Sequence, residues 1–560
     1  MRTKDLIAKR ERRERKRARA ERNNIEKKTQ LEVPAKEAFT LPADFSDEVL
    51  KELRQLPATI SQEEILRRRD MRDVLTFTID PADAKDFDDA LSFQVLENGN
   101  YQIGIHIADV THYVVEGSAV DEEAYQRGTS IYLVDRVIPM LPERLCNELC
   151  SLRPNEDKLC MAVVVEMDQQ AKVLRHKVCR TVINSDYRLA YEEAMEMIDG
   201  RLEAKRAPQK SADFSGTPQG ERQEALLEAL RTLNGLAKQL RAKRFEHGAI
   251  NFETPEVRFL LDEQGNPTEI IFHRSNDANH LIEEFMLLAN RIVAKEIGGD
   301  RGESLEAKGE RREAKPFVYR VHDVPDPEKL VKLGNFIRQF GFHLRTSSKR
   351  SVQNKHINSL LDSCQGTNSQ TLIETLAIRS MAKAVYSTSN IGHYGLAFPY
   401  YTHFTSPIRR YPDMMVHRLL SRYLLQSKVP CRHDKEVLEE ACVHCSDTEQ
   451  MAQMAERDSI KEMQARWMSS RIGEEFDGVI SGVTEFGLFV QLRDTLTEGL
   501  VPIRTIAPHD YMQYDEENYC LIAARSGKTY TLSDSVRVRV TKADVERKQI
   551  DFVLVEDDQY

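Results

Sequence analysis

The sequence contains no apolar run that approaches the roughly 20 residues needed to cross a membrane. Its N-terminus is charged and has no apolar core, so it lacks the pattern of a secretory signal. The nine cysteines among 560 residues are irregularly spaced, which argues against a disulfide framework and for a reducing compartment. No internal repeat is visible. We therefore expect a cytoplasmic protein that makes no contact with a membrane.

The sequence also lacks an excess of positive charge, because 90 Asp and Glu outnumber 80 Lys and Arg and the formal net charge is −10. That value alone argues against a nucleic-acid partner, but net charge is a weak guide when charges are segregated along a chain. Residues 2–28 are dominated by Arg and Lys. Such a basic arm could bind RNA on a globally acidic protein, or it could be an exposed tail without a specific role, and both interpretations stay open.

The length exceeds what one hydrophobic core supports, so we expect several domains. Residues 1–30 form the basic arm, which we expect to be helical or disordered, and residues 31–70 form a proline-containing linker region. A long mixed α/β region spans 71–470. Several short strands within 473–556 then predict a small closed barrel of the OB type.

The segment from Thr78 to Ser92 is the most informative part of the chain. It contains five aspartates: Asp80, Asp83, Asp86, Asp88 and Asp89. Carboxylates this dense repel one another unless a cation lies among them. Mg²⁺ prefers a few carboxylates, several waters and the phosphate oxygens of a substrate. The segment lacks the glycine and the terminal glutamate of an EF-hand loop, so it favours metal-assisted phosphate chemistry over calcium binding.

Apolar residues alternate on both sides of this segment. The alternation predicts strands over residues 75–79, 91–95 and 103–107, with the aspartates on a loop between the first two. A solvated acidic loop is the alternative, but Pro81 and the absence of Ser and Gly favour a loop with a defined structure. His106 lies within the third strand, and we expect it to be a structural histidine.

A second informative segment runs from Tyr400 to Asp413. Two X-Pro pairs, at 406–407 and 411–412, force an extended or turning backbone and present Arg409 and Arg410. A positioned guanidinium is a natural partner for a metal-bound phosphoryl group. Taken alone, the two arginines would be assigned to surface salt bridges, but the aspartate loop in the same domain favours phosphate binding.

These two segments, together with residues 104–113, 127–142 and 281–286, resemble the catalytic domain of the RNase II/RNB exoribonucleases, in particular the bacterial ribonuclease R branch. The resemblance implies an α/β (α+β) RNB catalytic domain followed by an all-β OB-fold barrel of the S1 type. It also implies Mg²⁺-dependent, processive 3′→5′ hydrolysis of RNA to nucleoside 5′-monophosphates, acting in RNA turnover and quality control.

The resemblance assigns roles to individual residues. By motif match, the Mg²⁺ carboxylates are Asp80, Asp86, Asp88 and Asp89. Asp88 is then the residue most critical for catalysis, and Arg409 matches the arginine that contacts the scissile or terminal phosphate. Among the remaining substrate-binding residues, Tyr132 matches a base-stacking tyrosine, and Phe317 is the weaker candidate for the opposing ring. Arg410 is a further substrate-binding candidate. In the barrel, Phe486 and Phe489 are candidate stacking platforms. For Tyr132 and Phe317 the alternative is ordinary core packing, and one of the two barrel phenylalanines could belong to the core.

The implied partner is single-stranded RNA or RNA with a 3′ overhang, bound by a monomer. Ribosomes and RNA-decay proteins are further candidate partners. The ribonuclease R branch carries cold-shock-type barrels ahead of the catalytic domain, whereas only about 60 residues precede it here. The chain is then a truncated form or a start-site variant, or the basic arm replaces some of the RNA affinity. We expect weaker capture of RNA and an altered ability to open structured RNA, with hydrolysis retained. The alternatives are a non-catalytic RNA-binding factor and a metal phosphoesterase that acts on DNA or small nucleotides.

Overall fold

The structure is a computed structural model. It describes residues 44–201, 219–251, 256–299, 315–345, 350–367, 369–424, 433–507, 510–515 and 519–555. The chain divides into two compact units, Met1–Phe45 and Ser46–Tyr560, and the description below concerns the second. The basic arm expected at residues 1–30 lies outside the described residues, as does the linker region before residue 44.

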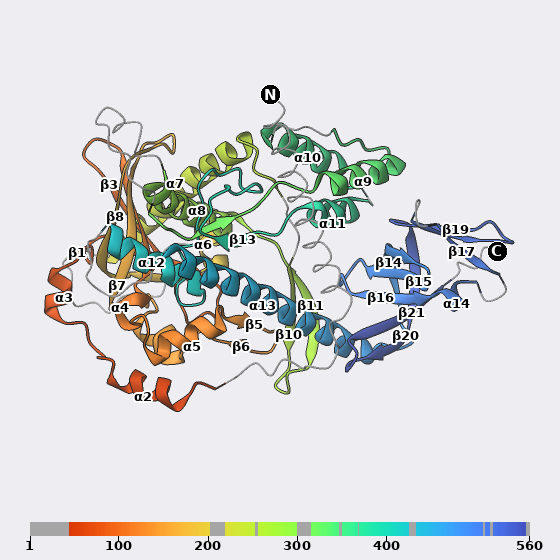
Figure 1. Cartoon of the computed structure of the whole chain (residues 1–560), viewed down its shortest axis with the longest axis horizontal. Helices are drawn as coiled ribbons and strands as arrows, with labels where there is room; N and C mark the ends of the chain where they lie inside the picture. The colour runs from red at the N-terminus through yellow and green to blue at the C-terminus, as the bar shows by residue number, and fades with distance from the viewer. Residues whose placement is uncertain are drawn as a thin grey trace, which may run out of the picture. The chain divides into compact units, whose positions relative to one another are not determined.

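The α/β body is built on a seven-stranded sheet with the order β1-β8-β7-β4-β3-β2-β9 (Figure 1). Its strands are β1 (Arg69–Asp70), β2 (Thr76–Asp80), β3 (Asp89–Val95), β4 (Tyr101–Ala108), β7 (Asp157–Met167), β8 (Val173–Asn184) and β9 (Tyr187–Ala190). The two edge pairs, β1 with β8 and β2 with β9, are parallel, and the inner pairs are antiparallel. The three strands predicted around the aspartate loop are therefore confirmed.

A buried polar group crosses the middle of this sheet. His106 on β4 is fully buried, and its ring nitrogens lie 2.9 Å from Ser92 Oγ and 3.1 Å from Thr181 Oγ1. Gly104 leaves the space that this ring occupies, since a Cβ at that position would collide with both His106 and Ser92. His106 is thus a satisfied structural histidine, as predicted, and burial lowers the pKa of its imidazole to about 3.

Helices cover the sheet and continue beyond it. The helices of the body are α2 (Asp47–Gln55), α3 (Gln62–Leu66), α4 (Val110–Tyr113), α5 (Ala119–Arg127), α6 (Tyr191–Ile198), α7 (Gln219–Glu246), α8 (Asp277–Gly298), α9 (Pro327–Ile337), α10 (Arg350–Cys364), α11 (Gln370–Ser380), α12 (Tyr411–Tyr423) and α13 (Lys435–Ser469). Helices α6 and α8 pack on the sheet, and α12 lies beside α4 and α13. None of the helices within the described ranges is both long and apolar enough to cross a membrane.

Local sequence explains where these helices begin. The Asn276 side chain accepts hydrogen bonds from the backbone N–H groups of Ala278 and Asn279, and the Asn279 side chain accepts one from the N–H of Asn276. This reciprocal cap fixes the start of α8. In α12, Pro412 occupies the first turn, where a missing N–H costs nothing. The proline that breaks the preceding extended segment therefore also begins the helix that follows it.

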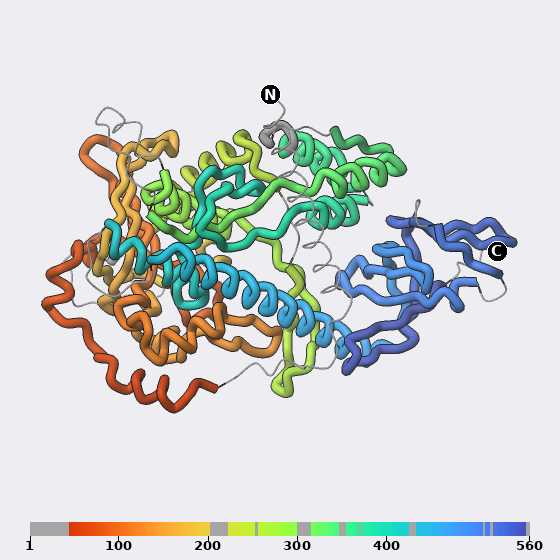
Figure 2. The backbone as a smooth tube through the Cα atoms, viewed as in Figure 1, coloured from red at the N-terminus to blue at the C-terminus, as the bar shows by residue number. Residues whose placement is uncertain are grey.

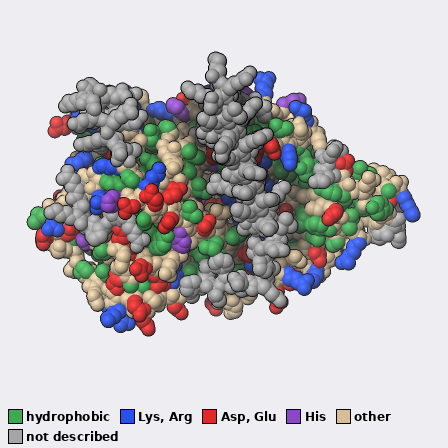
Figure 3. Space-filling view, in the orientation of Figure 1, with side chains coloured by type: hydrophobic (Ala, Val, Ile, Leu, Met, Phe, Trp, Pro, Cys, Tyr) green, Lys and Arg blue, Asp and Glu red, His purple; other side chains and the backbone are tan. Residues whose placement is uncertain are grey.

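Three short two-stranded ladders complete the body. They are β5 (Ile131–Tyr132) with β6 (Val137–Ile138), β10 (Glu256–Leu261) with β11 (Pro267–His273), and β12 (Tyr319–Val321) with β13 (Val385–Ser387). Both β5 and β11 contact α13, the 35-residue helix that leads along the chain into the C-terminal barrel (Figure 2). On the face shown in Figure 3, acidic side chains gather over the body, in keeping with the negative net charge.

The C-terminal part of the described chain is a closed five-stranded barrel with the order β14-β15-β16-β21-β20. Its strands are β14 (Glu475–Thr484), β15 (Gly487–Leu492), β16 (Glu498–Pro502), β20 (Ser535–Asp544) and β21 (Gln549–Leu554). A three-stranded sheet of β17 (Met512–Asp515), β18 (Cys520–Ala523) and β19 (Thr529–Thr531) is inserted between β16 and β20. Gly487 approaches the backbone of Val501 too closely for a Cβ. The predicted fold class, an α/β body followed by a small all-β barrel, is confirmed.

Candidate active site

The aspartate loop connects two adjacent strands at one end of the sheet. Asp80 is the last residue of β2 and is paired with Ala190 of β9, while Asp89 is the first residue of β3 and is paired with Ile107 of β4. The remaining aspartates lie between them, and of these Asp83 is exposed whereas Asp88 is buried. The sheet therefore fixes the two ends of the loop, and the loop carries the other carboxylates between them.

Hydrogen bonds hold the loop in one shape. The Phe87 N–H donates to Ser151 Oγ at 3.0 Å, and the Ser151 hydroxyl donates to the Lys85 carbonyl at 2.7 Å. On the other side, Arg188 Nη2 donates to the carbonyls of residues 81 and 82 at 2.8 and 2.7 Å. The loop is thus tied to β9 and to the segment around residue 151, so it is not a freely solvated acidic turn.

The carboxylates are held in an environment that disfavours their charged form. Burial raises the pKa values of Asp80, Asp86, Asp88 and Asp89. Mutual repulsion adds to this effect: Asp88 and Asp86 act on Asp80, Asp86 and Asp89 act on Asp88, and Asp80 acts on Asp89. A cation bound among these carboxylates would remove both penalties.

The donor set fits a Mg²⁺ ion that keeps part of its hydration. Asp80 Oδ2 is buried and has no hydrogen-bond partner, which is the state expected of a free metal ligand. No three His, Cys, Asp or Glu side chains of the described ranges converge on one point as a closed metal cage would require. Mg²⁺ typically takes one or two protein carboxylates and fills its remaining positions with water and substrate phosphate. The residues therefore fit an open Mg²⁺ site.

Arg409 is the cation that faces this cluster. Its Nε lies 3.5 Å from Asp88 Oδ2, and the backbone N–H of Ile408 donates to Asp88 Oδ1 at 2.9 Å. The Arg409 side chain is 42% exposed, whereas that of Asp88 is almost completely buried. A guanidinium that is anchored on one side and open on the other can meet an incoming phosphate. The structure thus brings together the two residues predicted to be catalytic, which are 321 positions apart in the sequence.

Tyr132 lies in the segment that runs alongside Arg409. The Ser130 N–H and the Thr129 hydroxyl both donate to the Arg409 carbonyl at 2.9 Å, and the Tyr411 N–H donates to the Gly128 carbonyl at 3.0 Å. We call this ladder, formed by residues 128–130 and 409–411, the seam. Tyr132 is 39% exposed. Burial of its hydroxyl raises its pKa, with smaller effects from the charges of Arg409, which lowers it, and of Asp86 and Asp88, which raise it. Tyr132 is therefore an accessible aromatic ring close to the carboxylates.

Two predicted substrate residues are placed differently. Phe317 has no exposed surface and packs edge-on against Tyr319, so it offers no open ring face to a base. Arg410 points into the body, where its Nε and Nη2 bind both oxygens of Asp413 at 3.1 and 2.7 Å. Neither side chain lies with Tyr132 and Arg409 in an accessible position, and we leave both out of the proposed substrate contacts.

Tyr191 is a site residue that the sequence does not reveal. It follows β9, and its pKa is raised by burial and then by the charges of Asp89 and Asp80. Its nearness to the carboxylates results from the parallel pairing of β9 with β2, which joins segments more than a hundred residues apart. No local pattern marks such a pairing, and a pairing signal across homologues would be needed to find it.

In the barrel, both predicted stacking rings lie at the surface or partly so. Phe486 is 52% exposed and Phe489 is half-buried, and their rings meet edge to face with centroids 6.0 Å apart. Arg537 and Arg539 on β20 are both paired with Glu475 on β14, at 3.1 and 2.6 Å. The ring pair is therefore an accessible aromatic feature of the barrel, while the two exposed arginines already have a carboxylate partner.

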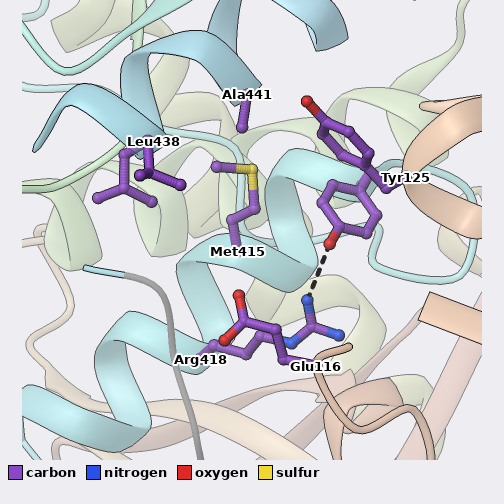
Figure 4. Close-up of a pocket in the computed structure, with 8 residues that line it drawn as sticks. Glu116, Tyr125, Met415, Arg418, Leu438 and Ala441 are labelled. Carbon is purple, nitrogen blue, oxygen red and sulfur yellow. Dashed lines mark hydrogen bonds between the residues drawn. The ribbon is translucent and has the colours of Figure 1, made fainter. Parts of the chain in front are cut away.

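A surface depression between α5, α12 and α13 lies apart from the aspartate loop (Figure 4). It is lined by Glu116, Tyr125, Tyr411, Met415, Arg418, Val437, Leu438 and Ala441. Arg418 donates to the Tyr411 hydroxyl at 3.1 Å and is paired with Asp121 at 2.6 Å. None of the four predicted metal carboxylates contributes to its lining.

Comparison with known proteins agrees with this arrangement. Residues 68–426 match the RNB domain, and residues 469–554 match the S1 RNA binding domain. The chain belongs to the RNB family of 3′→5′ exoribonucleases. The RNB match contains the aspartate loop, Tyr132, Tyr191 and Arg409, and the S1 match contains Phe486 and Phe489.

Similar proteins from several bacteria support the same family. The chain is 40% identical to ribonuclease R of Aquifex aeolicus and 41% identical to ribonuclease R of Thermotoga maritima, in each case over 92% of this chain and 69% of the relative. The solved structure of Mycoplasma genitalium RNase R in complex with ribose methylated single-stranded RNA matches with a TM-score of 0.79 at 28% identity. That match covers 91% of this chain and 76% of the other. The predicted resemblance to ribonuclease R is confirmed.

Proposed function

We propose that this RNB-family protein hydrolyses single-stranded RNA processively from its 3′ end, releases nucleoside 5′-monophosphates, and depends on Mg²⁺. The observation that carries the proposal is the juxtaposition of buried Asp88 with the half-exposed guanidinium of Arg409, beside a buried Asp80 oxygen that has no partner. A protein that only binds RNA has no use for clustered carboxylates next to a polyanion, because they repel it.

The chain's own residues divide the chemistry between them. Asp80, Asp86, Asp88 and Asp89 would surround Mg²⁺, with one or two of these carboxylates as direct ligands. When bound, the ion lowers the pKa of water and neutralises charge on the scissile phosphate. Arg409 would donate to the non-bridging phosphate oxygens as negative charge builds up on them in the transition state. Asp88 orients Arg409 from the protein side through their 3.5 Å contact, and it is itself oriented by the Ile408 N–H.

We assign binding of the RNA bases to aromatic rings. Tyr132 would stack on a base next to the scissile phosphate, since its ring is accessible and its segment is joined to Arg409 through the seam. Phe486 and Phe489 would stack on bases further along the strand. Stacking is tolerant of sequence because every base has a π-face, which suits an enzyme that degrades RNA in general. The stacks also require unpaired bases, so the proposed substrate is a single strand or a 3′ overhang.

The deciding experiment is a gel time course on a 5′-labelled single-stranded RNA with Mg²⁺ or EDTA. We expect the full-length RNA to be converted directly to a very short 5′ end product, and only in the presence of the metal. We expect Asp88→Asn to lower the rate on the order of 10³-fold, because the uncharged amide loses both its metal affinity and its attraction for Arg409.

Asp83→Asn is the matched control, because it removes a carboxylate from the same loop at an exposed position. It should leave the rate within about twofold of the wild type. If the wild-type protein shifted the RNA in a native gel but never shortened it, the chain would be a non-catalytic RNA-binding factor. A ladder of intermediate lengths would instead contradict processivity alone.

A further inference from the structure

The turn that presents Arg409 is fixed from inside the body by a single carboxylate. Asp413 has no exposed surface. Its Oδ2 accepts a hydrogen bond from the backbone N–H of Ser406 at 2.8 Å, and its two oxygens bind the guanidinium of Arg410. It lies in the first turn of α12, where the helix dipole favours a negative charge. These hydrogen bonds therefore tie the start of α12 to the turn of residues 406–410 that carries Arg409.

Ser406 connects that carboxylate to the catalytic arginine. Its carbonyl accepts hydrogen bonds from the backbone N–H groups of Arg409 and Arg410 at 3.3 and 3.0 Å, which closes the turn. Its hydroxyl oxygen accepts a hydrogen bond from Arg409 Nη2 at 3.1 Å. One serine thus binds Asp413 through its N–H, the turn through its carbonyl, and the Arg409 guanidinium through its side chain.

We propose that Ser406 and Asp413 are positioning residues that together aim the Arg409 guanidinium at the phosphate. The inference rests on the proposed function and adds to it how the arginine is held before substrate arrives. The contact of Arg409 Nε with Asp88 Oδ2, at 3.5 Å, is longer than a strong hydrogen bond and fixes the guanidinium only loosely. The Ser406 hydroxyl supplies the second fixed point, and Asp413 holds the serine.

Preorganisation of a charged group is worth most in the transition state, because no reorganisation is then needed as charge develops. Loss of the Ser406 hydroxyl should therefore act on kcat and leave KM nearly unchanged. Loss of the Asp413 charge should have a larger effect of the same kind, since it releases Arg410 and the Ser406 N–H together. A purely structural role would lower the melting temperature without this selective effect on kcat.

The test is a double-mutant cycle measured by single-turnover kinetics on single-stranded RNA with Mg²⁺. Ser406→Ala should lower kcat by about tenfold and Asp413→Asn on the order of 30-fold or more, with KM changed by less than about threefold. In an Arg409→Lys background, the guanidinium nitrogen that donates to Ser406 Oγ is absent. In that background, Ser406→Ala should have almost no further effect on kcat.

Asp109→Asn is the control for burial. Asp109 is almost completely buried and forms ion pairs with Arg68 at 2.7 Å and Arg180 at 3.9 Å. Its Oδ1 accepts a hydrogen bond from the Thr111 hydroxyl at 2.9 Å, and these contacts lie outside the 406–410 turn. It should destabilise the fold but keep the kcat of the folded fraction. Equal losses of kcat from Ser406→Ala in both backgrounds, or no loss in the wild-type background, would overturn the inference.

The cycle separates this inference from the function on which it rests. If Asp413→Asn fails to fold, Ser406→Ala still decides, because it removes one hydroxyl and leaves the backbone bonds in place. If the wild-type protein itself leaves RNA uncut with Mg²⁺, the proposed function has failed. If the wild type cuts RNA and Ser406→Ala cuts equally fast, only the positioning role has failed.

Discussion

Asp80 and Asp89 lie at the ends of two neighbouring strands, and each is buried close to other carboxylates. Burial, with repulsion from Asp88 and Asp86, raises the pKa of Asp80 to about 7, and burial, with repulsion from Asp80, raises the pKa of Asp89 to about 8. Both values lie well above the value of about 3.9 for an aspartate in an unfolded chain. Between about pH 4 and pH 8, the folded, metal-free chain therefore binds more protons than the unfolded chain. Its stability must fall as the pH rises through this range, by about 1.4 kcal/mol per pH unit for each proton released.

We expect Mg²⁺ to reverse this trend. Metal binding requires the deprotonated carboxylates, so the affinity for Mg²⁺ should increase between pH 6 and pH 8. The melting temperature measured with EDTA should fall from pH 6 to pH 8. The rise in melting temperature on adding Mg²⁺ should become larger over the same interval. The double variant Asp80→Asn/Asp89→Asn should remove both effects. A Mg²⁺-dependent increase that is the same at both pH values would contradict the proposed metal site.

Individual residues also show how far the sequence alone can predict a site. The aspartates and Arg409 stand out because their chemistry is concentrated in short segments that resemble known motifs. Phe317 and Arg410 come from equally suggestive segments, yet one is packed in the core and the other is bound to Asp413. Burial of a single side chain depends on which distant element covers it, and neither composition nor spacing encodes that directly.

At the scale of elements, the barrel allows a prediction about RNA binding that can be tested separately from hydrolysis. Phe486 is half exposed just before β15. Removal of its ring should therefore lower the affinity for RNA without lowering the stability of the fold. Phe486→Ala should weaken the binding of single-stranded RNA by about 1–3 kcal/mol, while Phe486→Tyr, which keeps a ring at the same place, should bind like the wild type. Fluorescence anisotropy with labelled RNA in EDTA measures both.

The melting temperature of each variant should match that of the wild type. If Phe486→Ala bound RNA as tightly as the wild type, the ring would not be a stacking platform. If the tyrosine variant lost as much affinity as the alanine variant, the loss would have a cause other than the π-face.

The strands around the aspartate loop were predictable because their signals are local. Period-two alternation, Pro81 and the turn at residues 98–100 together specify an antiparallel meander of β2, β3 and β4. The pairing of β9 with β2 and the bridge between Thr129 and Arg410 are different, because they join segments far apart in the chain. Such contacts are decided by packing of the whole domain, so Tyr191 and Ser406 could be given roles only once the fold was known.

For the molecule as a whole, the net charge of −10 makes a prediction about salt. Acidic side chains gather on the face of the body shown in Figure 3. With a net negative charge, we expect RNA to be held by a few localised cations and by stacking, and not by a general positive field. We expect the logarithm of the binding constant to fall with the logarithm of salt concentration with a slope of roughly −2 to −4, at about −0.7 per phosphate contact.

Binding isotherms in EDTA at several KCl concentrations measure this slope. Arg409→Gln should reduce its magnitude by about 0.7, because one phosphate contact is lost. Phe486→Ala should lower the affinity at every salt concentration and leave the slope unchanged. A slope near zero for the wild type would mean that stacking alone holds the strand.

The seam described above has a consequence for attempts to re-engineer such an enzyme. The Ser130 N–H and the Thr129 hydroxyl hold the Arg409 carbonyl, and Tyr132 follows two residues later on the same segment. A substitution that shifts the backbone at residue 132 would therefore also shift the backbone that carries Arg409. Under the proposed function, a redesign of the base contact should keep the seam intact in order to keep the rate of hydrolysis.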